Sequence, residues 1–276
     1  MTGTRPTRLF LLLAALSLAA AQGTAQPAGQ AAAAQTASQT AVPTAALPEI
    51  HYPADFLAAL RALRDSVYES GEPSGVEKAA TELARSAAVR GLGEPALPLA
   101  LSTMEYLAGR SWNEAGDKKK AIPHFEAAVT HARLAMKSGE YPAGLMALTK
   151  PLSELCLLKG MGFLIANGPR ISENARKILA MEPDHAGAIV TLAAAKAYPP
   201  PIFGGNPAEA IARLTELLAA RGSSFEKDEL FDIRTCMGTA EAKLGHKPEA
   251  RAWFEAALAL YPRNSFALAE LEKASQ

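Results

Sequence analysis

Apolar side chains recur every three or four residues along most of this chain, beginning near Ile50. This period places them on one stripe of an α-helix, whereas a half-buried β-strand would alternate apolar and polar residues. The pattern therefore predicts a succession of amphipathic helices. The first two stripes are formed by Phe56, Leu60, Leu63 and Val67, and then by Val76, Ala79, Leu83 and Ala87.

Turn-forming sequences separate these stripes. Gly, Pro, Asn, Asp and Ser gather in them, and these residue types end one helix or cap the start of the next. About eleven helices fit between the turns, and because nearly all connections are short, consecutive helices should be antiparallel neighbours. The turns are expected at 71–74, 91–93, 116–117, 138–139, 168–169, 183–184, 198–207, 222–224, 245–246 and 262–264.

One segment near the C-terminus has the length and spacing of a helical-hairpin repeat. Residues 231–264 span 34 positions with the pattern Gly-x11-Ala-x3-Phe-x2-Ala-x4-Pro. Small residues allow the two helices of a pair to approach, the phenylalanine fills the space between them, and the proline stops the second helix. The residues in these roles are Gly238, Ala250, Phe254, Ala257 and Pro262.

The same spacing recurs upstream, within residues 102–137. There Gly109 is followed by Ala121, Phe125 and Ala128 at the same intervals, although no proline closes the second helix. A third helix is in register with the last, because Ala210, Leu214 and Leu217 each precede Ala250, Phe254 and Ala257 by the same 40 positions.

These motifs closely resemble the tetratricopeptide repeat (TPR). The resemblance implies an all-α fold, a right-handed α-solenoid of antiparallel helix hairpins whose concave groove binds peptides or other protein segments. Residues 265–273 have no partner helix after them, which suits a helix that caps the last repeat. Repeats in such a solenoid should contact only their neighbours.

The N-terminal residues predict export. Arg5 and Arg8 precede a 13-residue apolar run from Leu9 to Ala21 that ends in small residues, as in a secretory signal peptide over 1–21. Residues 22–48 are almost entirely Ala, Gln, Thr, Ser, Gly and Pro, which is typical of a disordered tether. The folded repeat domain is expected over 49–276, in a periplasmic or secreted protein without stable membrane insertion after cleavage.

The charge balance argues against nucleic-acid binding, and the two cysteines are expected to be free. Lys and Arg number 28, as do Asp and Glu, so the chain lacks the basic excess that a nucleic-acid binder needs. Cys156 and Cys236 fall on helices that should lie too far apart for a disulfide, and we interpret both as buried core residues.

The loop over 198–207 is longer, stiffer and more apolar than a turn of this repeat requires. Three prolines follow Tyr198, and two glycines follow Phe203. In one interpretation Tyr198, Ile202 and Phe203 form a contact surface for a ligand or partner; in the other they pack on their own repeats. Similar loops occur in bacterial exported repeat proteins, including some associated with TRAP transporters.

Catalytic and metal-binding motifs are missing from the sequence. His124 and His131 stand seven positions apart, which is not the spacing of a helical metal pair, and no nucleophile elbow or zinc-protease motif occurs. We therefore expect no enzyme, no metal and no cofactor. Two hypotheses stay open: a scaffold for an unidentified protein or peptide, and a binding module for a small or apolar ligand, accessory to a transporter.

Overall fold

The computed structural model describes residue 48 and residues 50–276. The predicted signal peptide over 1–21 and nearly all of the predicted tether over 22–48 lie outside these residues.

The described part of the chain is helical throughout its regular secondary structure, which confirms the all-α prediction. It contains eleven α-helices and one short 3-10 helix. In chain order they are α1 (Ala54–Tyr68), α2 (Pro73–Val89), α3 (Ala96–Glu114), α4 (Lys118–Ala135), α5 (Pro142–Leu158), α6 (Met161–Met181), α7 (Ala186–Ala197), η2 (Pro201–Phe203), α8 (Pro207–Arg221), α9 (Lys227–Leu244), α10 (Lys247–Leu258) and α11 (Ser265–Ser275).

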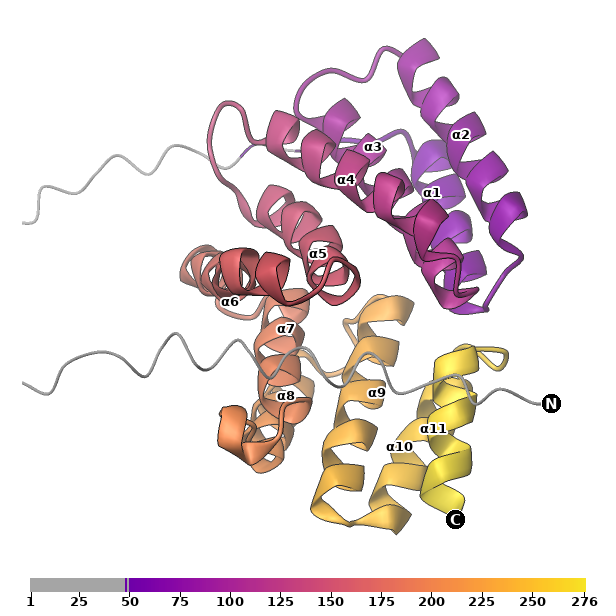
Figure 1. Cartoon of the computed structure of the whole chain (residues 1–276). Helices are drawn as coiled ribbons and strands as arrows, with labels where there is room; N and C mark the ends of the chain where they lie inside the picture. Colours follow the sequence, from indigo (N-terminus) through magenta and orange to yellow (C-terminus); the bar gives the residue numbers. More distant parts are fainter. Residues whose placement is uncertain (1–47, 49) are drawn as a thin grey trace, which may run out of the picture.

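Consecutive helices pack as hairpins, and the hairpins follow one another along an arc (Figure 1). Every odd-numbered helix from α1 to α9 contributes side chains to the inner face of this arc, whereas the even-numbered helices lie mostly outside it. This arrangement confirms the predicted α-solenoid of antiparallel hairpins. The last helix, α11, packs on α10 and covers the end of the final repeat.

The repeat residues lie where two helices of a hairpin touch. A Cβ on Gly238 would lie 2.9 Å from the ring of Phe254, and a Cβ on Gly109 would lie 2.9 Å from the ring of Phe125. Both phenylalanines are fully buried, as are Ala121, Ala128, Ala250 and Ala257. Glycine is therefore required at two equivalent positions so that an aromatic ring can fill the space between paired helices.

One predicted turn is wrong. The expected break at 168–169 falls inside α6, and the chain turns instead at Gly160, which has a φ of 87° that favours glycine. Pro169 deprives its helix of one amide donor, but it lies on the exposed face, where water can bond the carbonyl that is left free. In this segment the chain turns at Gly160, and the helix continues through Pro169.

Candidate functional site

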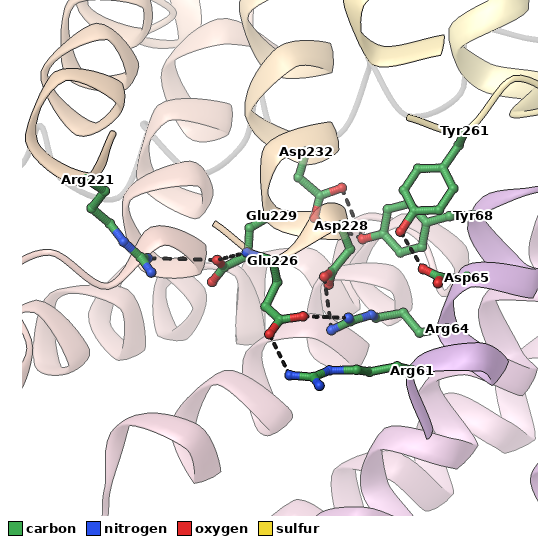
Figure 2. Close-up of polar contacts among 10 residues, drawn as sticks. All are labelled: Arg61, Arg64, Asp65, Tyr68, Arg221, Glu226, Asp228, Glu229, Asp232 and Tyr261. Atoms are coloured by element: carbon green, nitrogen blue, oxygen red, sulfur yellow. Dashed lines mark hydrogen bonds and ion pairs between the residues drawn. The ribbon is translucent and has the colours of Figure 1, made fainter. Parts of the chain in front are cut away.

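The two ends of the solenoid meet, so the prediction that repeats contact only their neighbours is wrong here. Side chains of α1 reach α9 and the turn that leads into it (Figure 2). Arg61 Nη2 lies 2.7 Å from Glu226 Oε1, and Arg64 Nη1 lies 2.9 Å from Asp228 Oδ1. The second pair is the better shielded, because the Asp228 side chain is only 6% exposed.

An aromatic cluster completes this contact between the ends. The Tyr68 ring, at the end of α1, packs edge-on against Phe231 with centroids 5.4 Å apart, and its centroid lies 5.0 Å from that of Tyr261. The Tyr261 hydroxyl donates to Asp65 at 2.7 Å, and Asn264 Nδ2 donates to the Tyr68 carbonyl at 2.7 Å. Buried hydrogen bonds and ring contacts therefore hold α1 against the C-terminal repeat.

The contact between the ends bounds one side of the concave groove, which forms a partly open cavity of about 690 Å³. We call this space the central cavity. Its walls come from α1, α3, α5, α7 and α9, with contributions from α6 and from the start of α11. Aromatic side chains are well represented among them: Tyr52, Tyr68, Tyr106, Tyr198, Phe231 and Phe266.

Arg110 is surrounded by acidic and aromatic groups in the cavity wall. Its guanidinium lies 4.2 Å from the centroid of the Tyr68 ring, and its Nε donates to Glu114 at 2.8 Å. Two further carboxylates accept hydrogen bonds from neutral donors: Asp232 from the Tyr68 hydroxyl, at 3.0 and 3.1 Å, and Glu154 from Asn113 Nδ2 at 3.1 Å.

Burial changes the ionisation of these two carboxyl groups. Removal from water raises the pKa of Glu154 to about 7, and it raises the pKa of Asp232 above its ordinary value. The Arg110 guanidinium lowers both pKa values but does not offset the burial. The positive charge of Arg110 therefore offsets only part of the cost of removing these two carboxylates from water.

Comparison with known proteins adds little beyond the fold. No known protein family and no curated protein matches the chain. Among solved structures it is similar to a thermophilic TPR protein from Thermus thermophilus, with 18% sequence identity over 79% of this chain and 98% of that one, at a TM-score of 0.45.

The residues proposed from the loop over 198–207 are separated by the structure. Tyr198 is 8% exposed and lines the central cavity. Ile202 is 81% exposed in η2, and Phe203 beside it is half-buried. The three side chains therefore do not share one surface: Tyr198 belongs to the cavity wall, while Ile202 faces solvent.

Sequence reasoning did not single out Tyr68, Arg110, Glu154 or Asp232. A usable signal was present for one of them, because Lys150 and Glu154 are the charged residues of the otherwise apolar helix α5 and stand four positions apart. That spacing puts both on one helix face. The remaining residues come together only because α1 meets α9, and hairpin spacing does not encode that contact.

The cysteines have the environment expected of core residues. Cys156 and Cys236 are free and buried. Burial raises the pKa of the Cys156 thiol to about 11, so it is protonated at neutral pH although it borders the central cavity. Across the described residues, no group of three or more His, Cys, Asp or Glu side chains is arranged to hold a metal ion.

Proposed function

We propose that this protein is a non-catalytic binding protein that holds its ligand in the central cavity. The observation that carries the proposal is the contact between α1 and the C-terminal repeat, which makes the groove a partly open cavity of about 690 Å³. Sites for small molecules commonly measure about 300–1,000 Å³ and combine apolar walls with a few polar groups. The ligand is therefore a small molecule or a short chain segment rather than a folded protein surface.

The chemistry of the cavity wall supports binding rather than catalysis. Nucleophilic catalysis needs a nucleophile hydrogen-bonded to a base that a third group orients. Here the Cys156 thiol is protonated at neutral pH. The Asp232 carboxyl accepts from the Tyr68 hydroxyl and the Glu154 carboxyl from the Asn113 amide, and neither pair is a nucleophile with its base. These groups suit recognition of a ligand by charge and hydrogen bonds.

The proposed setting is the cell envelope. The basic residues and apolar run of the first 21 positions support export, and the short length of that run supports cleavage rather than anchoring. Within the described residues no helix is long and apolar enough to cross a bilayer. An exported protein of this kind would bind its ligand outside the cytoplasm, and a role as accessory to a transporter is one form of this proposal.

A second function, a scaffold for another protein, is supported by the loop after α7. Ile202 is exposed on a loop stiffened by prolines, so its position is fixed without cover from its own domain. A fixed apolar side chain in solvent is suited to contact with a partner. In this form the loop binds a protein, and the central cavity receives a segment of it.

One experiment tests the cavity directly. The protein is purified gently from its native envelope, and native mass spectrometry determines whether a ligand is bound. The variant Ala143→Trp places an indole at a position that is exposed yet lines the cavity, so the protein should fold but lose the bound mass. The matched control is Ala212→Trp on the outer surface of α8. If Ala143→Trp keeps the bound mass, the ligand is not in the cavity and the proposal is wrong.

A further inference from the structure

The lining of the central cavity has an excess of acidic groups. Six carboxylates border it, against three side chains of Arg or Lys. The carboxylates are Glu114, Glu154, Glu226, Asp228, Glu229 and Asp232, and the basic residues are Arg64, Arg110 and Lys150. A cleft lined by one sign of charge focuses its electric field, because the protein walls have a lower dielectric constant than water.

Most of these carboxylates already have a charged partner. Glu226 and Asp228 pair with arginines of α1, and Glu229 lies 3.8 Å from Arg221 while it caps the start of α9. Glu114 pairs with Arg110. These ion pairs connect the protein's own side chains, so these four carboxylates have no unpaired charge for a ligand.

Asp232 and Glu154 differ from the other four. Their hydrogen-bond donors are the Tyr68 hydroxyl and the Asn113 amide, both neutral. The charged groups around them are few: Arg110 acts on both, Glu114 opposes Glu154, and Lys150 and Asp228 act on Asp232 with opposite signs. Arg110 and Lys150 are thus the two cations beside three carboxylates, Glu114, Glu154 and Asp232, so negative charge exceeds positive charge here once all three are ionised.

Aromatic rings stand beside these carboxylates. Tyr68 accepts the Arg110 guanidinium on its face and donates its hydroxyl to Asp232. Tyr106 has Lys150 Nζ at 6.0 Å from its ring centroid. Two cations of the protein itself, Arg110 and Lys150, therefore lie near these ring faces. Ring faces and carboxylates both attract positive charge, so this wall is suited to a cation.

We propose that the central cavity binds an organic cation, with an ammonium or guanidinium head against Asp232 and Glu154 and an apolar body against the surrounding aromatic and aliphatic walls. This inference rests on the proposed function, since it names the class of ligand that the same cavity takes. An anionic ligand at Arg110 is the competing case. That anion would meet Glu114, Glu154 and Asp232 around a guanidinium that is already paired.

Three phenylethyl probes with a cationic, a neutral and an anionic head test the class of ligand. Phenethylammonium, 2-phenylethanol and 3-phenylpropionate are titrated into the full mature protein by calorimetry. Phenethylammonium should bind, and the neutral and anionic probes should bind roughly tenfold more weakly or not at all. Its affinity should rise between about pH 6 and about pH 8, because Glu154 ionises in this range whereas an alkylammonium stays charged.

Variants locate the bound cation. Glu154→Gln and Asp232→Asn keep the shape and the hydrogen bonds but remove the charge, so each should weaken phenethylammonium by roughly tenfold or more. Glu173→Gln, on the exposed side of α6, is the matched control and should change nothing. Because Glu154→Gln removes a poorly compensated charge, it should also fold, which a thermal melt checks.

The outcomes separate the two proposals. If 3-phenylpropionate or 2-phenylethanol binds better than phenethylammonium, and Ala143→Trp abolishes this, the cavity is a binding site but its preference for cations is wrong. If Glu154→Gln and Asp232→Asn leave phenethylammonium affinity unchanged, the head does not lie against these residues and the inference is wrong. If none of the three probes binds, while the purified protein carries a bound mass that Ala143→Trp removes, the cavity is a binding site but the inference about an aromatic cation is wrong.

Discussion

The hairpin at the N-terminus of the solenoid is less self-sufficient than the repeat at its C-terminus. The C-terminal repeat has a capping box between Glu226 and Glu229, and a tight contact of Gly238 with Phe254. By contrast, α1 packs less extensively on α2 than α9 does on α10, a groove lies between α1 and α2, and Val89 at the end of α2 is 83% exposed.

This difference explains why contact between the ends matters. Terminal repeats of a solenoid lack one neighbour and need a cap. Here the N-terminal hairpin obtains part of its cover from the C-terminal repeat, through Tyr68 and its contacts with Phe231, Tyr261 and Asn264. The C-terminal repeat, whose own end is covered by α11, therefore also helps to cap the N-terminal hairpin, and the two ends together border the central cavity.

The largest expected effect follows from Phe254→Ala. Emptying this fully buried aromatic site should lower the free energy of unfolding by about 3–5 kcal/mol. Because α1 depends on the C-terminal repeat, hydrogen exchange should show lost protection in α9 to α11 and also in α1, while α3 to α5 stay protected. The exposed neighbour Arg251→Ala should change stability by less than about 0.5 kcal/mol. Unchanged protection of α1 would mean that the two ends are not coupled.

A smaller effect is expected from Asn264→Ala. Asn264 caps α11 through the Ala267 amide and also donates to the carbonyl of Tyr68, so its loss should cost about 2 kcal/mol. Asn206→Ala is the matched control, because Asn206 caps α8 without bonding a distant helix, and it should cost about 1 kcal/mol. Urea unfolding measures both. Equal losses would show that the contact between the ends contributes no stability.

The attachment of the N-terminal hairpin should also depend on pH. His124 of α4 bonds Glu105 of α3 at 2.7 Å and lies 3.6 Å from Glu77 of α2, and the hydrogen bond with Glu105 raises its pKa. A raised histidine pKa means that this stabilisation, at most about 1 kcal/mol, is fully present below about pH 6.5 and disappears as pH rises through the folded-state pKa.

The test compares unfolding at several pH values with and without His124→Gln. Glu154→Gln serves as the background, because the raised pKa of Glu154 also lowers stability as pH rises. In that background His124→Gln should flatten the remaining pH dependence between about pH 6 and about pH 8. A slope that does not change would assign the pH dependence to other groups.

The fold was largely predictable because its determinants are local. Hydrophobic spacing and turn residues indicated the helices, and the glycine-to-phenylalanine spacing indicated how two hairpins pack. The one misplaced turn, at 168–169, arose because Pro169 resembles a helix stop, although α6 tolerates it on an exposed face. Local chemistry decided all of these features.

The candidate site was not predictable in the same way. Tyr68 and Asp232 are 164 positions apart in sequence and meet only because the solenoid closes. The curvature that closes it is the sum of small rotations between successive hairpins, which a spacing pattern does not contain. Glu154 with Lys150 was the part of the site that the sequence marked, as two charges on one face of an apolar helix.

The smallest effect on stability is expected at the exposed apolar residues, and there the loop after α7 should differ in function from the end of α2. Ile202→Ser and Val89→Ser replace side chains that are 81% and 83% exposed, so each should change stability by less than about 0.5 kcal/mol. Phe203→Ser, which uncovers a half-buried ring, should cost more. If the loop after α7 binds a partner, Ile202→Ser should reduce co-purification of that protein from the envelope while Val89→Ser leaves it unchanged. Equal recovery with all three variants would remove the loop from the partner surface and leave the central cavity as the binding site.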